Sequence, residues 1–315
     1  MQSFTDEQLN QIAEKHLNVS AQSITKEPIT TGLFNRSYFL VTQDVDYVLR
    51  IAPPRDSVFL FYEREMMRQE PEVHRLVREK TGTPVADIIV FDDSREIIPN
   101  DYIIMVRLPG TPMTFASSYS EESVLKQVGS YMAQVHKIRA EQYGYLGAHR
   151  PMEPQNAWVD AFRVMWEKQL DDIIATGHYN AEEKKAFMQL LEDNIRHFER
   201  PAPSCLLHMD LWNQNILVDG MSYVTGIIDW DRALWGDPEM EFAVLDYCGM
   251  AKGAFWEGYG QKRDVSESAH VRQVFYYLYE LQKYIVIEQG RKEDPAMARR
   301  YKEHVVQVLR HATRL

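Results

Sequence analysis

Two short apolar runs near the middle of the chain, each bordered by polar residues, most limit what this sequence can fold into. Residues 206–219 read LLHMDLWNQNILVD, and a second run from Val224 to Ile228 is followed by Asp-Trp-Asp. Runs this short and this apolar predict buried strands, which can hold polar side chains rigidly at their ends. The sequence therefore predicts that Asp210, Asn215 and Asp229 are presented at the ends of buried strands.

The spacing of these polar residues is typical of phosphoryl transfer. An Asp, an Asn five residues later and a following strand that ends in Asp provide one carboxylate for an acceptor hydroxyl and two oxygen ligands for Mg²⁺. We expect Asp210 to be the catalytic base, and Asn215 and Asp229 to bind the metal. His208 is expected to be structural, hydrogen-bonded beneath the loop. Asp231 is left open between a further metal-side carboxylate and a solvated turn residue.

The same block resembles a known family. The segments LLHMDLWNQNILVDG and VTGIIDWDRALWGDPEMEFA are similar to the signature of the aminoglycoside phosphotransferase family, small-molecule kinases with a protein-kinase-like fold. Met209 stands where the family usually has Gly, and Glu241 where it has Asp, but neither change removes a catalytic group. The likeness is specific over residues 206–243 and looser over residues 29–138.

The resemblance implies an α+β fold of two lobes. Residues 1–108 are expected to form a small antiparallel sheet lobe that binds the nucleotide. Residues 109–315 are expected to form a mostly helical lobe that carries the catalytic groups and binds the acceptor, with Pro109-Gly110 as the link. The co-substrate is expected to be ATP or GTP, because the main-chain groups that hold the purine in the family do not distinguish the two.

The resemblance also assigns nucleotide contacts in the N-terminal lobe. The turn over residues 30–37 stands where the family covers the nucleotide phosphates, so Gly32 and Asn35 are expected to lie against them. At the link between the lobes, Val106 would offer its carbonyl to the purine and Leu108 its N–H.

Arg50 departs from the family at a position that binds phosphate. The family usually carries Lys there, which bridges two phosphates and pairs with a Glu of the next helix. Arg keeps the positive charge and binds phosphate in a bidentate manner, but it is longer and planar, so the exchange is not neutral. Glu70 is the expected partner of Arg50, with Glu63 and Glu65 as alternatives.

Local patterns predict the remaining elements. Thr5 with Gln8, and Asn180 with Glu183, form capping-box patterns that begin helices. Asp237 followed by Pro238 is typical of a further helix start. Other helices are expected over residues 59–80, with an interruption near Pro71, and over 121–139, 158–166, 187–198 and 271–315; strands are expected over 29–42, 46–52, 88–92 and 102–106.

The amino-acid composition indicates which classes of binding partner and which cellular location are favoured or disfavoured. The net charge of the 315-residue chain is −11, which disfavours nucleic acid. No stretch approaches about twenty apolar residues, so no membrane segment is expected. Two isolated cysteines, Cys205 and Cys248, are typical of reduced thiols and favour the cytoplasm. Residues 201–260 hold nine acidic and two basic residues, which favours a cationic acceptor, although a solvated acidic surface has the same composition.

Together these features predict an ATP- or GTP-dependent kinase that phosphorylates a hydroxyl of a small molecule. The first expected acceptor is an aminoglycoside-type or other aminated antibiotic, with antibiotic resistance as the role; a metabolic amino alcohol or sugar is an alternative. Another alternative is a nucleotide-binding protein that no longer catalyses, supported by Arg50. A protein kinase is disfavoured, because Asp237 follows Asp229 by only eight residues, too few for an activation segment.

Overall fold

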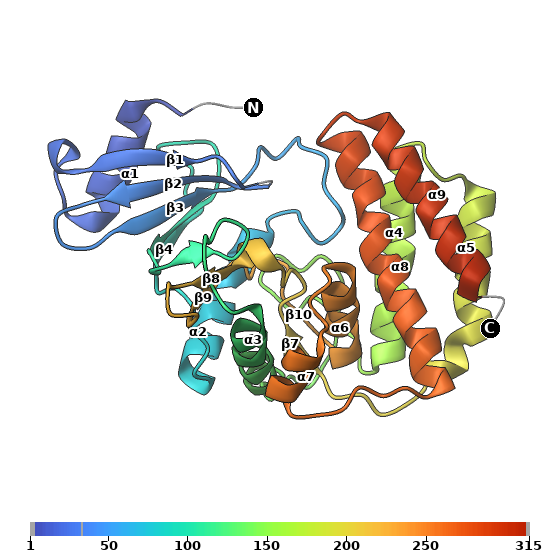
Figure 1. Ribbon diagram of the computed structural model, residues 1–315. Helices are drawn as coiled ribbons and strands as arrows, with labels where there is room; N and C mark the ends of the chain where they lie inside the picture. The colour runs from blue at the N-terminus through green and yellow to red at the C-terminus, as the bar shows by residue number, and fades with distance from the viewer. Residues whose placement is uncertain (1–3, 33, 313–315) are drawn as a thin grey trace.

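The chain folds into two lobes joined by a short link, in a computed structural model that describes residues 4–32 and 34–312 (Figure 1). One lobe is built on an antiparallel sheet and the other is mostly helical. The α+β architecture expected from the sequence is therefore confirmed.

The small lobe is a five-stranded antiparallel sheet in the order β1-β2-β3-β5-β4, covered on one face by helix α1 (Figure 1). Leu40, Leu49 and Ile104 project from the sheet into a buried cluster with Leu9 and Ile12 of α1. The capping box at the start of α1 is confirmed by the side chain and backbone bonds between its two residues. The elements are α1 (Asp6–Leu17), η1 (Ala21–Ser23), β1 (Thr25–Ile29), β2 (Arg36–Val41), β3 (Tyr47–Ile51), β4 (Ile88–Asp92) and β5 (Tyr102–Val106).

Helix α2 (Glu70–Lys80) follows a short 3-10 helix, η2 (Met66–Gln69), between β3 and β4. Pro71 lies in the first turn of α2, so the expected interruption near this residue is present as the change from η2 to α2. The helix expected to begin at residue 59 was wrong for residues 59–65, which form turns and irregular backbone. A proline in the first turn costs no hydrogen bond, because the N–H groups there have no partner within the helix. Pro71 therefore begins this helix, and Glu70 is placed at its buried start.

The connection over residues 52–65 crosses from the small lobe to the large one (Figure 1). Leu60 and Tyr62 are almost fully buried in the core cluster of the large lobe. Between them, the Phe61 N–H donates to Asp172 Oδ2 of helix α4 at 2.7 Å. Residues 52–65 thus tie the two lobes together, while the division at residues 108 and 109 stays a prediction.

The centre of the large lobe holds two small sheets, as the apolar runs predicted. One pairs β7 with β10, and the other has the order β6-β8-β9. All three residues of β7 and of β8 are buried. Helices α3, α6 and α7 cover these sheets. The elements are β6 (Thr111–Pro112), α3 (Glu121–Val135), β7 (Cys205–Leu207), η4 (Asn213–Asn215), β8 (Ile216–Val218), β9 (Val224–Ile227), β10 (Leu234–Gly236), α6 (Pro238–Tyr247) and α7 (Gly253–Tyr259).

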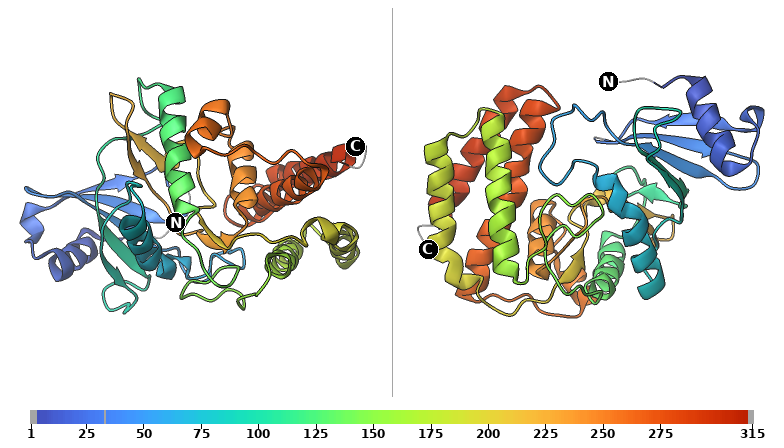
Figure 2. Two further views of the ribbon diagram at one scale, coloured as in Figure 1. Left: turned by 90° about the horizontal axis from the view of Figure 1, so that it is seen from below. Right: turned by 180° about the vertical axis from the view of Figure 1, so that it is seen from behind.

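Four long helices form the end of the large lobe farthest from the sheet of the small lobe (Figure 2). The core around these helices is rich in aromatic side chains. The rings of Phe162 and Phe198, for example, are stacked with their centroids 5.2 Å apart. The predicted helix starts at Asn180 and Asp237 are confirmed by their side-chain caps. None of the helices in the described residues is long and apolar enough to cross a membrane. The elements are α4 (Trp158–Ala175), α5 (Ala181–Asn194), η3 (Ile195–His197), α8 (Glu267–Gly290) and α9 (Pro295–Ala312).

Candidate active site

The loop over residues 208–215, here called the catalytic loop, joins β7 to β8 and is supported by His208. The Nδ1 atom of His208 accepts the Asp210 N–H at 3.1 Å, and its Nε2 lies 3.0 Å from the Ile228 carbonyl oxygen. With Nδ1 accepting from the Asp210 N–H, Nε2 is the ring nitrogen that faces the Ile228 carbonyl as a donor. The ring centroid lies 4.3 Å from that of Trp230. These contacts agree with the structural role expected for His208.

Glu241 of α6 anchors the same loop through its backbone. Its carboxylate accepts the N–H groups of His208 at 2.5 Å and of Met209 at 3.0 Å. Met209 has a φ of 65°, in the left-handed region that favours the glycine usual in the family, so these bonds hold a strained turn. Burial raises the pKa of Glu241, but the His136 side chain and the backbone N–H of His208 outweigh burial and lower it. The longer acid therefore still anchors the loop as an anion.

Asp210 presents its carboxylate to the cleft between the lobes. Its Oδ2 atom accepts from Asn215 Nδ2 at 2.9 Å, and its Oδ1 accepts from Arg232 at 3.1 Å. Lys283 Nζ lies 3.8 Å from the same Oδ1, and the Asp210 side chain is 26% exposed. Burial raises the pKa of Asp210, but the positive charges of Lys283 and Arg232 outweigh burial and lower it. The carboxylate is thus ionised, fixed in orientation and reachable from the cleft.

Asn215 and Asp229 converge because their strands pair. Strand β8 lies antiparallel to β9, with Ile216 opposite Ile227, and the Ile228 N–H donates to the Asn215 carbonyl at 2.9 Å. Asp229 comes immediately after this last bonded residue, so both side chains line one cleft with Asp210. Asp210, Asn215 and Asp229 thus lie together, as the apolar runs predicted, and the catalytic and metal-binding roles of the three residues stay predictions.

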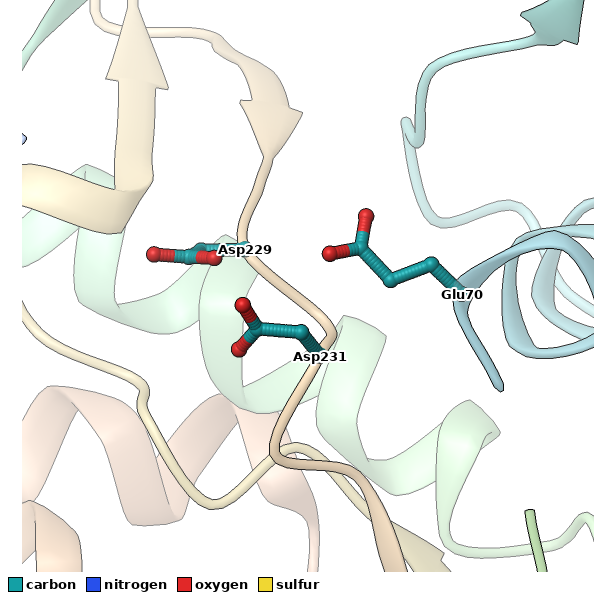
Figure 3. Close-up of side chains that lie close together, drawn as sticks. All are labelled: Glu70, Asp229 and Asp231. Carbon is teal, nitrogen blue, oxygen red and sulfur yellow. The ribbon is translucent and has the colours of Figure 1, made fainter. Parts of the chain in front are cut away.

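Three carboxylates, from Glu70, Asp229 and Asp231, gather where the two lobes meet (Figure 3). The guanidinium of Arg50 lies among them. Its Nη1 donates to both oxygens of Glu70 at 2.7 and 2.8 Å. Its Nη2 donates to Asp229 and, at 3.1 Å, to Asp231. The ion pair expected between Arg50 and Glu70 is therefore present, and the alternative Glu63 instead pairs with Arg291.

Asp231 is part of this cluster, so the alternative of a solvated turn residue was wrong. Only 4% of its surface is exposed. Burial, and then the charge of Asp229, raise its pKa well above the ordinary value. Burial raises the pKa of Glu70 to about 7 against the opposing charge of Arg50. Burial lowers the pKa of Arg50, but its carboxylate neighbours outweigh burial and raise it.

The donor set of the cluster fits Mg²⁺. One guanidinium faces three carboxylates whose oxygens lie within 4.8 Å of one another, so negative charge is in excess where a divalent cation would be held. Asn215 uses its Nδ2 for the carbonyl and the carboxylate of Asp210, which leaves Oδ1 as a ligand atom. Hard oxygen ligands of this kind suit Mg²⁺.

Hydrogen bonds tie described residues of the flap over residues 30–37 to the large lobe. Asn35 Nδ2 donates to Asp231 Oδ2 at 3.1 Å, and Gln214 of the catalytic loop donates to the Thr31 carbonyl at 2.7 Å. A Cβ atom at Gly32 would come within 3.2 Å of the Asn35 carbonyl oxygen, so the tight turn favours glycine. Gly32 and Asn35 therefore sit at the mouth of the cleft, and their contact with phosphate stays a prediction.

The link between the lobes carries the backbone groups assigned to the purine. The Arg107 N–H donates to the Asp46 carbonyl at 2.9 Å, and the Val106 N–H donates to the Asp87 carbonyl at 2.8 Å. The backbone N–H and C=O groups of adjacent strand residues point to opposite edges of the strand. Since Arg107 bonds toward β3, the backbone N–H and C=O of Val106 point away from β3. Leu108 packs over Gly226, where a Cβ atom would come within 2.8 Å of it. The purine contacts of Val106 and Leu108 stay predictions.

The cleft continues past Asp210 into a space bounded by α8 and the connection 52–65, with a total volume of about 490 Å³. The charges in this acceptor end are paired. Arg232 and Lys283 contact Glu280, and Arg291 contacts Glu63. The acidic excess of residues 201–260 is thus not repeated here, so it gives no support to a cationic acceptor. Side chains of the acceptor end include Tyr62, Arg232, Tyr247, Cys248, Glu280, Lys283, Tyr284, Ile287 and Arg291.

Sequence reasoning missed Arg232, Glu280 and Lys283. Residues 271–315 were predicted only to be helical. A signal was nevertheless present, because Glu280 and Lys283 stand three residues apart within a largely apolar and aromatic run of α8. Charged residues at that spacing share a face of a helix, and burial of such a face calls for a partner or a function.

Comparison with protein families identifies one match. The model of the phosphotransferase enzyme family matches residues 25–270. Among individual proteins, the "Probable ketoamine kinase" of Vibrio parahaemolyticus is 26% identical over 277 residues, which cover 82% of this chain and 85% of that protein.

Solved structures share the fold. A candidate fructosamine-3-kinase from Haemophilus somnus superposes with a TM-score of 0.69 at 19% identity, covering 96% of both chains. The aminoglycoside phosphotransferase APH(4)-Ia, in a ternary complex with AMP-PNP and hygromycin B, gives a TM-score of 0.67 at 17% identity and covers 95% of this chain and 98% of that one. The two-lobed fold expected from the resemblance is thus that of kinase structures.

Proposed function

This chain belongs to the phosphotransferase enzyme family, and on that premise we propose that Asp210, Asn215 and Asp229 carry the reaction. The enzyme is a phosphotransferase that transfers phosphate to an alcohol group of a small molecule. The observation that best supports the proposed roles is that these three side chains line one cleft, with Asp210 tied to Asn215 at 2.9 Å.

Asp210 orients the acceptor hydroxyl and accepts its proton. The hydroxyl oxygen bonds to the γ-phosphorus while the bond from that phosphorus to the β–γ bridging oxygen breaks, which releases a nucleoside diphosphate. A carboxylate held on both sides, by Asn215 and Arg232, requires little rearrangement as the proton moves. Mg²⁺, when bound by Asn215 and Asp229, supplies positive charge for the β- and γ-phosphates.

The nucleotide, ATP or GTP, is proposed to lie under the flap with its purine at Val106 and Leu108. Arg50 takes the place of the usual Lys and neutralises phosphate charge. Its Nη1 remains on Glu70, which positions the guanidinium, and its Nη2 would exchange its bonds to Asp229 and Asp231 for the phosphates. Backbone N–H groups near Gly32 and Asn35 cover the phosphates from above.

For the acceptor we propose a ketoamine, an amine-bearing sugar derivative. The support is the likeness to a probable ketoamine kinase over most of both chains. The acceptor end fits this class, because the tyrosines Tyr62, Tyr247 and Tyr284 line it. The paired charges there leave no net attraction for a polycation. An aminoglycoside-type antibiotic is the second candidate, supported by the shared fold with the hygromycin B complex of APH(4)-Ia.

The test is a transfer assay with purified protein. Mg–ATP and Mg–GTP are each combined with a ketoamine made from glucose and a primary amine, with hygromycin B, and with an amino alcohol. Phosphorylated product is followed by ³¹P NMR. We expect transfer to the ketoamine by the wild-type protein and transfer at least about 10²-fold slower by D210N. Nucleotide binding with no turnover on any acceptor would instead support a protein that no longer catalyses.

A further inference from the structure

Four charged side chains, here called the charge tetrad, meet at the acceptor end of the cleft: Asp210, Arg232, Glu280 and Lys283. Arg232 bridges two carboxylates, with Nη1 at 3.1 Å from Asp210 and Nη2 at 3.2 Å from Glu280. Lys283 lies on the other side, in contact with Glu280 and with its Nζ at 3.8 Å from Asp210 Oδ1. Both cations thus flank one oxygen of the proposed base.

Helix α8 inserts two of these charges into an apolar surrounding. Glu280 and Lys283 are 1% and 4% exposed, and their helical neighbours Tyr279, Leu281 and Ile285 are buried as well. Removing charged groups from water is costly, and a buried ion pair is commonly no more stabilising than an apolar pair of the same size. Stability alone therefore does not account for a lysine at this place, whereas its position beside the reacting groups does.

We propose that Lys283 is a positioning residue for transfer, held by Glu280 so that its charge lies at the acceptor side of Asp210. The inference rests on the proposed function, because it assigns to α8 a part in the same reaction. Lys283 holds the Asp210 carboxylate in its orientation from the side opposite Asn215, and it stabilises the phosphoryl group as that group reaches the acceptor oxygen.

The charge of the tetrad changes in the direction that this role requires. Before transfer, the two carboxylates and the two cations of the tetrad cancel. When Asp210 accepts the hydroxyl proton, one negative charge is lost and the tetrad carries a net charge of +1. The positive charge thus arises next to the acceptor oxygen at the moment when that oxygen gains a phosphoryl group. A lysine paired with Glu280 alone would not need to reach Asp210.

The experiment compares K283M with the balanced double variant E280Q/K283M. Removal of one such charge from a preorganised site lowers kcat about 10²-fold. We therefore expect a loss of about that size in K283M, with unchanged binding of Mg–AMP-PNP. If Lys283 serves only to neutralise Glu280, the double variant restores kcat to the wild-type value; under our proposal it remains as slow as K283M. Should K283M fail to fold, the double variant is compared directly with E280Q.

Two further measurements separate the possible failures. Each variant is assayed with the ketoamine as acceptor and, without an acceptor, for hydrolysis of Mg–ATP, in which water takes the place of the hydroxyl. Wild-type protein that is inactive in both assays overturns the proposed function, and the role of Lys283 with it. Active wild type with an equally active K283M overturns only the role of Lys283. K292M is the matched control, because Lys292 lies just beyond the same helix, on a half-exposed surface, and pairs with Glu288.

Discussion

The two ends of the cleft differ in charge. At the nucleotide end, Arg50 alone faces the carboxylates of Glu70, Asp229 and Asp231. At the acceptor end, the cations and anions of the charge tetrad cancel. Among the described residues of the cleft, carboxylates thus outnumber cations at the nucleotide end, where a metal ion and its nucleotide would be bound. The difference teaches that an acidic stretch of sequence need not attract a cationic substrate, because its excess can be directed at the metal.

The two ends also shift carboxylate pKa values in opposite directions. At the nucleotide end, burial raises the pKa of Glu70 to about 7. At the acceptor end, Lys283 and Arg232 outweigh burial and lower the pKa of Asp210. A base must be ionised to accept a proton, whereas acids that bind a metal can hold a proton until the metal replaces it. The following predictions test whether this division is real.

The largest effect is expected at Asp210. D210N keeps the shape of the side chain but cannot accept a proton, so kcat should fall by about 10²- to 10⁴-fold. Steady-state kinetics measure this loss, and binding of Mg–AMP-PNP should be unchanged because it takes place at the other end. D160N is the matched control, since Asp160 is an exposed carboxylate that also pairs with an arginine. A parallel loss of nucleotide binding in D210N would mean that the two ends do not act separately.

The raised pKa of Glu70 predicts how the metal-free protein responds to pH. The pKa of Glu70 is about 7 in the folded protein and 4.5 for an ordinary glutamate, so the folded protein holds this proton more tightly than the unfolded chain does. The contribution of this proton to the free energy of unfolding is complete below pH 4.5 and is lost as the pH rises through 7. A shift of this size corresponds to at most about 3 kcal/mol of unfolding free energy. The free energy of unfolding, measured with urea, should therefore fall between pH 4.5 and pH 8, and the fall should be smaller in E70Q than in the wild type.

The comparison between wild type and E70Q isolates this group. His74 titrates in the same window with the opposite sign, because burial lowers its pKa to about 4, but it is present in both proteins. E79Q serves as control, since Glu79 lies on the same helix with its side chain half exposed. An identical pH dependence in wild type and E70Q would show that Glu70 is already ionised at pH 5.

A smaller effect is expected on the Mg²⁺ requirement, which should change when the nucleotide end of the cleft is altered and not when the acceptor end is altered. D231N removes one of the carboxylates of the nucleotide end, and loss of a supporting group commonly weakens metal binding about tenfold or more. The Mg²⁺ concentration for half-maximal activity should rise accordingly. E280Q removes a buried carboxylate of the acceptor end and should leave that concentration unchanged. Equal shifts in the two variants would contradict the division of charge.

The sequence predicted the nucleotide end better than the acceptor end, for a physical reason. Asn215 directly precedes one short apolar run and Asp229 follows another, and a run of this kind determines both the strand and the position of the residue at its end. Capping boxes are equally local, since their bonds join residues three apart. Patterns that depend on neighbours in the chain can be read without knowledge of the packing.

The acceptor end depends on contacts between distant segments. Lys283 faces Asp210 only because α8 packs beside α6 and the catalytic loop, and no local pattern determines which face of α8 turns inward. The crossing of residues 52–65 into the large lobe has the same origin, because Leu60 and Tyr62 are apolar whichever lobe buries them. Arg50 was predicted in part. The resemblance to the family predicted its partner Glu70, whereas its contact with Asp231 could be seen only in the structure.

The smallest effect is expected in the flap, which lies above the nucleotide end and should therefore leave the acceptor end untouched. Q214A removes the hydrogen bond to the Thr31 carbonyl, one of the hydrogen bonds that tie the flap to the large lobe. A neutral hydrogen bond of this kind contributes about 1 kcal/mol, so KM for the nucleotide should rise roughly fivefold. KM for the acceptor and kcat should stay the same. Q189A, an exposed glutamine of α5 with a single side-chain bond, is the control. A fall in kcat without a change in nucleotide KM would show that Gln214 supports the catalytic loop and not the flap.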